Sequence, residues 1–305
     1  MSSVILFSGQ GLQQHRHVDE LIGYCDQYPI EDALLALIPE VFKAKNLSLD
    51  LYQNDFAQPF IFALQWCRWQ FLKDSMPDLE ISHVAGYSLG ELSAVICSTQ
   101  TDFNQGLALA KTRAELMSHV TAHHSGLTSI QGMNVESLKP LMEQTNTYLS
   151  IKLNDSSFIV GGFNQDLGDL ECLVQNQGCQ IKRLQVTIPS HTPLMQMAAL
   201  PYKDYIQTHV KNNLDIPILS GTKGYHLYQT KAALEALVYQ MDHMIDWDLS
   251  HEAIIESMPN VILELGPGNA LTRMLNLKNH NTQARAWDDF KGIEGLMQWF
   301  IRIAS

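Results

Sequence analysis

The segment ISHVAGYSLGELSAVICS, residues 81–98, decides the fold of this chain. A short apolar run at 81–85 enters the glycine-rich turn Gly86–Gly90, and an apolar helical pattern follows at 91–97. This order predicts a buried strand, a tight turn and a helix, the repeating unit of an α/β fold. The G-x-S-x-G spacing would leave the Ser88 hydroxyl exposed, because the flanking glycines let the backbone pass close by.

Similar patterns lie on both sides of this segment. The apolar runs 4–7 and 261–265 end in SGQG and GPG respectively, and 216–220 is another short strand pattern. We expect helices over 34–38, over 59–72 with Pro59 in the first turn, and over 103–120, 194–210, 231–241 and about 269–277. These elements predict one large α/β domain.

The elements between residues 125 and 186 are shorter. Strand patterns at 127–132, 149–153, 157–160 and 180–186 are interleaved with helical patterns at 135–144 and 166–177. This strand-helix-strand-strand-helix-strand order is typical of a ferredoxin-like unit. We therefore expect residues 126–188 to form a small domain inserted between the two parts of the large domain, residues 1–125 and 189–305.

Composition excludes several classes of function. The chain has 305 residues with 20 Lys and Arg against 32 Asp and Glu, a formal net charge of −12. That balance argues against nucleic acid or an anionic membrane as the main partner. No apolar run approaches the roughly 18 to 20 residues of a membrane-spanning helix, and the N-terminus lacks a signal-peptide pattern. The five cysteines form no CxxC pair and no zinc-site spacing with histidine, so we expect a cytoplasmic protein with no metal and no bound cofactor.

A serine hydroxyl is a poor nucleophile until a base takes its proton. Among the twelve histidines, His191 lies in the sequence PSHTPL, where Pro189 and Pro193 restrict the loop on both sides. This setting favours His191 as the general base. The backbone N–H of Leu89, at the start of the helix after Ser88, is expected to stabilise an oxyanion.

Several motifs together resemble the malonyl-CoA:acyl carrier protein transacylases. They occur in the order and approximate spacing of that family over nearly the whole chain: FSGQG at 7–11, QP at 58–59, GYSLGE at 86–91, Arg113 with Met117, Asn154, PSHTPLM at 189–195, Gln240 and ELGPG at 264–268. Within the family, the chain looks most like the malonate decarboxylase epsilon subunit. The family fold is an α/β-hydrolase-like large domain with a ferredoxin-like small domain, in agreement with the element order.

The resemblance implies roles for individual residues. Ser88 would be acylated by malonyl-CoA with His191 as its base, oriented by the backbone carbonyl of Gln240. Gln10 and the Leu89 N–H would form the oxyanion hole. Arg113 would hold the free malonyl carboxylate, although without the resemblance it would be read as a solvated helix charge. Asn154 would line the substrate cleft, and Gln240 would belong to the substrate-binding residues as well.

The implied reaction is a ping-pong transfer from malonyl-CoA to the thiol of an acyl carrier protein. The carrier would be the carrier subunit of malonate decarboxylase, with other subunits of that complex as further partners. One alternative is the same transfer in fatty acid or polyketide synthesis, and others are a serine esterase or thioesterase and a non-catalytic scaffold. An esterase would need an acidic residue orienting the histidine.

Two features depart from the family pattern. Tyr87 precedes the nucleophile where fatty-acid transacylases usually carry His, which weakens the fatty-acid alternative without affecting the chemistry. The chain is itself acidic, so docking of an acidic carrier would need either an apolar contact or a local basic patch, for which the candidates are Lys182, Arg183, Arg273 and Lys278.

Overall fold

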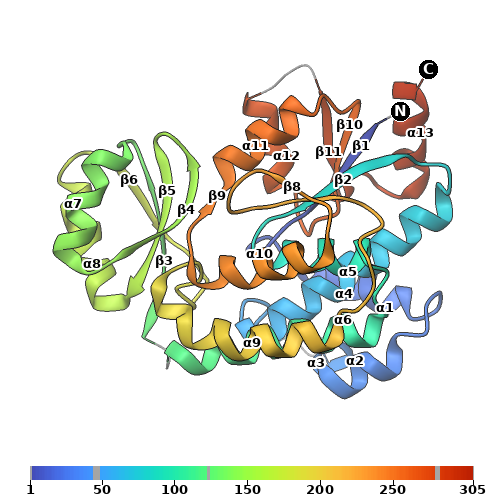
Figure 1. The fold of residues 1–305 in the computed structure, drawn as a ribbon, viewed down its shortest axis with the longest axis horizontal. Helices are drawn as coiled ribbons and strands as arrows, with labels where there is room; N and C mark the ends of the chain where they lie inside the picture. The colour runs from blue at the N-terminus through green and yellow to red at the C-terminus, as the bar shows by residue number, and fades with distance from the viewer. Residues whose placement is uncertain (1, 44–48, 122–123, 279–281, 305) are drawn as a thin grey trace.

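A six-stranded sheet with helices on both faces forms the larger part of the molecule (Figure 1). The structure is a computed structural model that describes residues 2–43, 49–121, 124–278 and 282–304. In spatial order the strands are β11 (Gln283–Ala286), β10 (Val261–Glu264), β1 (Ser3–Phe7), β2 (Ile81–Gly86), β7 (Ile218–Leu219) and β8 (His226–Leu227). All neighbours are parallel except the β7–β8 pair. Helices cover both faces of the sheet, and β1 and β10 are accordingly almost entirely apolar and buried.

The side chains of β1 alternate between two hydrophobic cores. Ile5 and Phe7 belong to the larger core, while Val4 and Leu6 belong to the core on the opposite face. The larger core is built with α1 (His15–Tyr24), α2 (Glu31–Leu37), α3 (Glu40–Lys43), α4 (Asn54–Ser75), α5 (Leu89–Ser98), α6 (Phe103–Thr121), α9 (Gln196–His209), α10 (Thr230–Asp242) and α13 (Ile293–Ala304). The opposite face is covered by α11 (Trp247–Glu256) and α12 (Ala270–Lys278).

A second sheet of five strands lies at the left of Figure 1. Its order is β6 (Gln180–Arg183), β3 (Ser125–Gln131), β5 (Ser157–Phe163), β4 (Tyr148–Asn154) and β9 (Ile245–Asp246). Helices α7 (Val135–Thr145) and α8 (Asn164–Gln175) cover one face and enclose a separate core. Elements β3 to β6 follow the chain order expected from the sequence. β9 comes from the C-terminal part of the chain and pairs with β4 in parallel.

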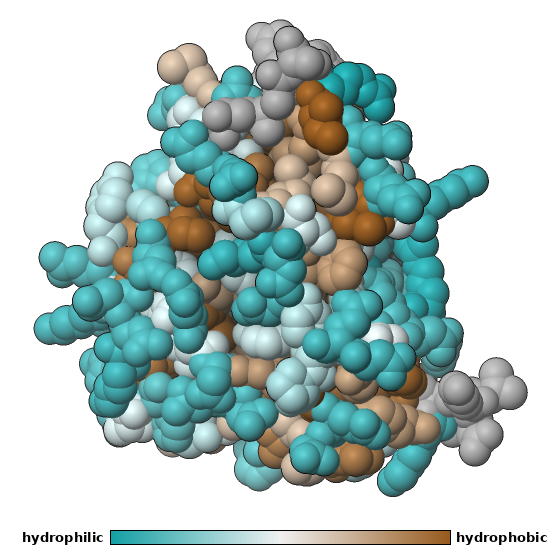
Figure 2. All heavy atoms as spheres, turned by 90° about the vertical axis from the view of Figure 1, so that its right-hand side faces the viewer, coloured by the Kyte–Doolittle hydropathy of each residue, from teal (hydrophilic) through white to brown (hydrophobic). Residues whose placement is uncertain are grey.

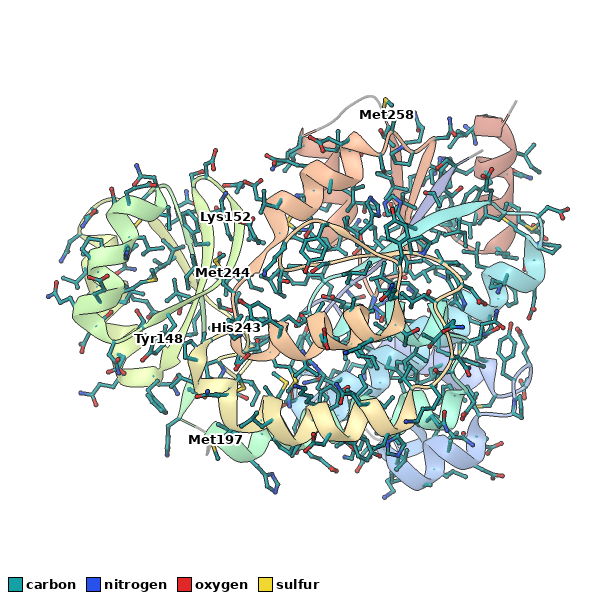
Figure 3. The ribbon with its side chains drawn as sticks, in the orientation of Figure 1. Tyr148, Lys152, Met197, His243, Met244 and Met258 are labelled. Atoms are coloured by element: carbon teal, nitrogen blue, oxygen red, sulfur yellow. The ribbon has the colours of Figure 1, made fainter. Side chains whose placement is uncertain are left out.

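An ion-pair cluster joins the second sheet to the larger unit. Asp248 at the start of α11 contacts Lys278 at the end of α12 and lies 3.1 Å from the Lys152 ammonium of β4. Figure 3 shows Lys152 at the border between the two units. The Asp248 side chain is 8% exposed, so this cluster restricts how β4 lies against the larger unit.

One local expectation was wrong. Helix α4 begins at Asn54, so Pro59 lies inside it rather than at its start. A proline there leaves the Asp55 carbonyl without its helical donor, and Lys111 Nζ approaches that carbonyl at 3.4 Å. Residues 15–17 begin α1, where His17 is buried and its ring is bonded to Asp288.

The face that carries α13 has a shallow apolar hollow of about 410 Å³. Figure 2 looks onto this side, where apolar patches lie among hydrophilic side chains. Met76, Leu79, Phe300 and Ile301 contribute to its lining. The hollow lies at the end of β2 opposite to Ser88. Within the described ranges, no helix has the length and apolar character to cross a membrane.

Candidate active site

Ser88 lies on a sharp turn between β2 and α5. Its φ of +56° is unfavourable for a residue with a side chain, and it forms the N-cap of α5. Glycine is required on both sides. A Cβ on Gly86 would lie 2.1 Å from the Glu91 nitrogen, and one on Gly90 would lie 1.9 Å from the Phe7 carbonyl oxygen. The two glycines therefore let the turn close against β1 while the Ser88 side chain points outward.

His191 reaches Ser88 from 103 residues further along the chain. Its Nε2 lies 2.8 Å from Ser88 Oγ, and its side chain is almost completely buried. The end of α10 fixes the ring and the backbone. His191 Nδ1–H donates to the Gln240 carbonyl, and its backbone N–H donates to the Met241 carbonyl at 2.9 Å. Both acceptors belong to the last turn of α10, where carbonyls lack helical partners.

Burial sets the protonation state of His191. Desolvation lowers its pKa to about 3, with the Gln240 carbonyl opposing this shift and the nearby Arg113 charge adding to it. The imidazole is therefore neutral at pH 7 and carries its proton on Nδ1, since a carbonyl can only accept. Its Nε2 lone pair faces Ser88 Oγ and can take the hydroxyl proton.

Gln240 also contacts the nucleophile directly. Its Nε2 donates to the Ser88 carbonyl at 3.1 Å. One residue thus holds both members of the pair, the histidine through its backbone and the serine through its side chain. The sequence predicted the backbone contact and a substrate-binding role for Gln240, but not the contact to the Ser88 carbonyl.

Leu89 and Gln10, the two expected oxyanion donors, belong to segments that meet at the Ser88 turn. Leu89 is the first residue of α5, so its amide has no acceptor within the helix. Gln10 lies on the loop after β1, which closely approaches the turn that carries Ser88. A Cβ on Gly9 would come within 2.9 Å of the Tyr87 carbonyl oxygen.

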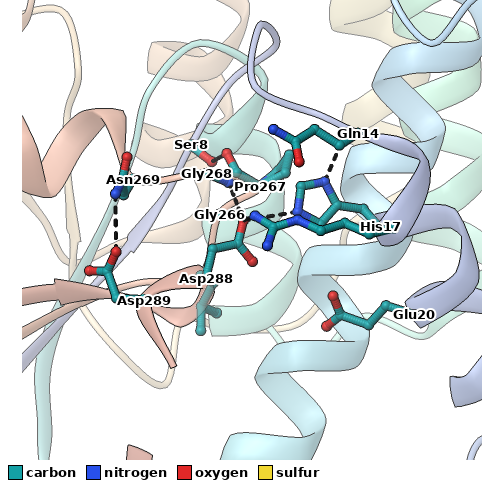
Figure 4. A network of polar contacts seen from close by, with 12 residues as sticks. Ser8, Gln14, His17, Glu20, Gly266, Pro267, Gly268, Asn269, Asp288 and Asp289 are labelled. Carbon is teal, nitrogen blue, oxygen red and sulfur yellow. Dashed lines mark hydrogen bonds and ion pairs between the residues drawn. The ribbon is translucent and has the colours of Figure 1, made fainter. Parts of the chain in front are cut away.

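A polar network supports the loop that carries Gln10 (Figure 4). Ser8 Oγ donates to the Pro267 carbonyl at 3.3 Å, and the Gln14 backbone N–H donates to His17 Nδ1 at 2.9 Å. His17 and Gly268 both contact Asp288 Oδ2. Both ends of the loop are therefore tied to the segments that follow β10 and β11.

Arg113 is a buried cation with unused donors. The side chain is 1% exposed, and Nη1 donates to Gln58 Oε1 at 2.6 Å. Its Nε and Nη2 are buried without a hydrogen-bond partner. Desolvation lowers the pKa of Arg113, which Tyr202 and Glu91 partly offset. A buried guanidinium with free donors is suited to bind an anion such as a carboxylate.

Asn154 has a local role in the structure. Its Oδ1 accepts from the Ser156 backbone N–H at 2.9 Å and from Ser156 Oγ at 3.3 Å. These bonds shape the turn between β4 and β5. Among the described residues, these bonds do not link Asn154 to Ser88 or His191, and its place in the substrate cleft stays a prediction.

Sequence reasoning missed two groups near the nucleophile. Asn54 lies between Gln10 and Gln58, four residues before Gln58 on α4, and this i, i+4 spacing was a readable signal. Glu91 is fully buried one turn after Ser88, and burial raises its pKa to about 8 while the Gly221 backbone and Arg113 oppose that shift. A glutamate three residues after the nucleophile gives no such indication in sequence.

The sequence is similar to known acyl transferases. A family model described as "acyl transferase domain" matches residues 36–286. The malonyl CoA-acyl carrier protein transacylase of Bacillus subtilis is 26% identical over 312 residues, which cover 96% of this chain and 95% of that protein. The polyketide biosynthesis protein PksE of Bacillus subtilis is 26% identical over 89% of this chain. The match spans only 35% of PksE.

A solved structure shows the same fold. It is a chain of a complex between a type II polyketide synthase acyl-carrier protein and its malonyl-transacylase. The TM-score is 0.82 at 22% identity, with 95% of this chain and 97% of that chain covered. At this identity, the likeness demonstrates a shared mixed α/β fold.

Proposed function

This chain belongs to the acyl transferase domain family and is an acyltransferase, and from that premise we propose that it transfers malonyl groups from malonyl-CoA to an acyl carrier protein. One observation carries the proposal. A buried, partly unpaired Arg113 lies close enough to the Ser88–His191 pair to lower the pKa of His191. A carboxylate-bearing acyl group would satisfy the free donors of Arg113 while its thioester reaches Ser88.

In the first half-reaction, Ser88 Oγ attacks the thioester carbonyl as its proton moves to His191 Nε2. The oxyanion is stabilised by the Leu89 N–H and Gln10. Collapse releases the CoA thiol, which takes the proton from His191. In the second half-reaction, the carrier thiol gives its proton to His191 and attacks the Ser88 ester. The bond to Ser88 Oγ then breaks, Oγ takes the proton back from His191, and the malonyl thioester leaves with the carrier.

The carrier belongs to fatty acid or polyketide synthesis in the version that the relatives favour, since one is named a polyketide biosynthesis protein and another a malonyl CoA-acyl carrier protein transacylase. The carrier subunit of malonate decarboxylase is the alternative, supported by the motif details of the sequence. Neighbouring genes and transfer assays with each carrier type separate the two. Among the candidate docking cations, Arg183 is paired with Glu171 and Lys278 with Asp248, which leaves Lys182 and Arg273 as the better candidates.

An esterase is less well supported by the histidine environment. The Nδ1 of His191 faces a neutral backbone carbonyl, whereas the esterase pattern calls for a carboxylate. The close Ser88–His191 contact likewise argues against a non-catalytic scaffold.

We also propose the finer description of the fold. The spatial order β6-β3-β5-β4 and the alternating helices support a ferredoxin-like small domain, formed approximately by residues 126–188. The turn at Ser88 between a parallel strand and a helix supports an α/β-hydrolase-like large domain.

Intact-protein mass spectrometry after brief mixing with malonyl-CoA tests the function. We expect a malonyl-sized mass gain on the wild-type chain, a much smaller gain with acetyl-CoA, and no gain on Ser88→Ala. Adducts of equal yield from both donors would contradict the malonyl specificity. No adduct from either donor would contradict the transferase proposal.

A further inference from the structure

A chain of amide hydrogen bonds connects Arg113 to Gln10. Arg113 Nη1 donates to Gln58 Oε1 at 2.6 Å, and Gln58 Nε2 donates to Asn54 Oδ1 at 2.8 Å. Gln10 Nε2 donates to the same Asn54 oxygen at 3.3 Å. One amide oxygen therefore joins Gln10, on the loop that approaches the Ser88 turn, to the Gln58 amide that holds the buried charge of Arg113.

The charge of Arg113 sets the direction of every bond in this chain. A guanidinium has donors only, so Gln58 must present its oxygen to Arg113 and its NH₂ to Asn54. Asn54 must then present its oxygen to Gln58. Gln10 can join the chain only by donating an N–H, since the remaining acceptor on Asn54 is that same oxygen.

Asn54 has no spare hydrogen-bonding capacity. Its Nδ2 donates to the Ala114 carbonyl at 2.8 Å and to Ser118 Oγ at 3.0 Å, and its Oδ1 accepts two bonds. A flipped amide would place its NH₂ group against two other NH₂ groups and its oxygen against a carbonyl. Asn54 is 5% exposed, so water does not readily replace these partners.

We propose that Asn54 is a positioning residue that aligns Gln10 and Arg113 together, so that the oxyanion donor and the carboxylate site share one anchor. This inference rests on the proposed function, in which Gln10 and Arg113 act on one acyl group. Loss of the anchor releases Gln10 directly and releases Arg113 through Gln58. Malonyl transfer depends on both side chains, whereas acetyl transfer depends on Gln10 alone.

The test measures the rate of Ser88 acylation in Asn54→Ala with malonyl-CoA, acetyl-CoA and p-nitrophenyl acetate. The last donor needs Ser88 and the oxyanion hole but neither CoA nor a carboxylate. We expect a loss of about tenfold or more with acetyl-CoA and p-nitrophenyl acetate, and a larger loss with malonyl-CoA. Asn54→Thr, which restores a hydroxyl acceptor, is expected to recover part of the rate.

A double-mutant cycle separates positioning from a structural role. If Asn54 acts through Gln10, the p-nitrophenyl acetate rate of Asn54→Ala/Gln10→Ala will match that of Gln10→Ala. Ser118→Ala is the matched control, because it removes a partner of Asn54 Nδ2 and leaves both bonds to Oδ1. We expect it to retain the wild-type rate within about twofold.

Two results would overturn the inference: losses that multiply in the double variant, or a melting temperature that falls in Asn54→Ala while all three rates stay unchanged. Failure of the proposed function is recognised separately. In that case the wild type reacts with p-nitrophenyl acetate and not with malonyl-CoA, and the cycle with p-nitrophenyl acetate still decides the role of Asn54.

Discussion

Arg68 and Arg113 are both buried arginines, but they differ in how many hydrogen-bond and ion-pair partners their guanidinium groups have. Arg68 is completely buried on α4, bonds Glu20 through two nitrogens at 2.8 and 2.6 Å, and bonds Asp288 at 2.7 Å. Its fourth bond is to the Leu265 carbonyl at 2.7 Å. Arg113 on α6 has one neutral partner, Gln58, and two nitrogens without any.

The pKa values of the two arginines shift in opposite directions for the same reason. Burial lowers the pKa of each guanidinium, but the carboxylates around Arg68 reverse that shift and raise its pKa above the ordinary value. The pKa of Arg113 stays lowered, because Tyr202 and Glu91 do not compensate for desolvation. Removal of a fully paired buried cation leaves its buried carboxylates without a counter-charge, whereas a partly paired cation keeps binding capacity for a ligand.

The largest effect is expected from Arg68→Met. This change leaves Glu20 and Asp288 without their buried cation, so we expect the free energy of unfolding to fall by about 3 to 5 kcal/mol. Urea denaturation followed by circular dichroism measures it. Lys231→Ala, which breaks the exposed pair with Glu235, is the control and should change little. If Arg68→Met and Lys231→Ala lowered the free energy of unfolding equally, the buried pairs of Arg68 would contribute no more than an exposed pair, and the proposed contrast with Arg113 would fail.

Arg113→Met is expected to affect substrate selection rather than folding. Loss of the charged donors should slow acylation by malonyl-CoA about 100-fold and leave acetyl-CoA nearly unchanged, since acetyl has no carboxylate. The free energy of unfolding should stay the same or rise, because an incompletely paired buried charge is removed. Lys111→Met on the same helix is the control. A matched loss with both donors would refute the carboxylate role.

Asp288→Asn should weaken the Arg68 network by about 1 to 2 kcal/mol at neutral pH, because a neutral amide forms weaker hydrogen bonds than a carboxylate. Burial would raise the pKa of Asp288, but the His17 hydrogen bond and the Arg68 charge hold it well below its usual range. Its contribution is therefore present above about pH 4 and is lost as the pH falls toward the lowered pKa. The stability of Asp288→Asn, measured by denaturation from pH 2 to 7, should fall less steeply below pH 4; a profile parallel to wild type would contradict this.

The smallest expected effect concerns how the acylation rate depends on pH through His191. With its pKa near 3, the wild-type rate of Ser88 acylation by p-nitrophenyl acetate should stay nearly constant from pH 8 to 5, where a solvated histidine would lose activity. Arg113→Met removes a cation that disfavours imidazolium, so the acidic limb of the profile should move to higher pH. A limb at pH 6.5 in the wild type would show that the imidazole is hydrated.

Local patterns in the sequence account for the Ser88 turn, and the motif PSHTPL accounts for the choice of His191. The same approach could not find the Arg68 network. Asp288 lies 220 residues from Arg68, and neither residue belongs to a recognisable motif. The segments β8 and β9 have two residues each, too few for a periodic pattern, and tertiary pairing creates them.

The burial of Arg113 depends on tertiary packing that the local sequence does not show. Without the family resemblance its pattern indicates a solvated helix charge, but the packing of α6 against α4 and α9 buries it. The turn that Asn154 closes is local by contrast, because an Asn two residues before Ser156 commonly bonds the backbone in this way.

The acceptor for His191 is part of the main chain, and this affects how mutations can reach it. Every amino acid at position 240 supplies a carbonyl, so no single codon change can delete the group that holds Nδ1. Genetic drift at this site would thus alter the side-chain contact to Ser88 and leave the histidine oriented. The backbone of α10 therefore fixes the orientation of His191. A saturation library at position 240 would underestimate how much the enzyme depends on the carbonyl at this position.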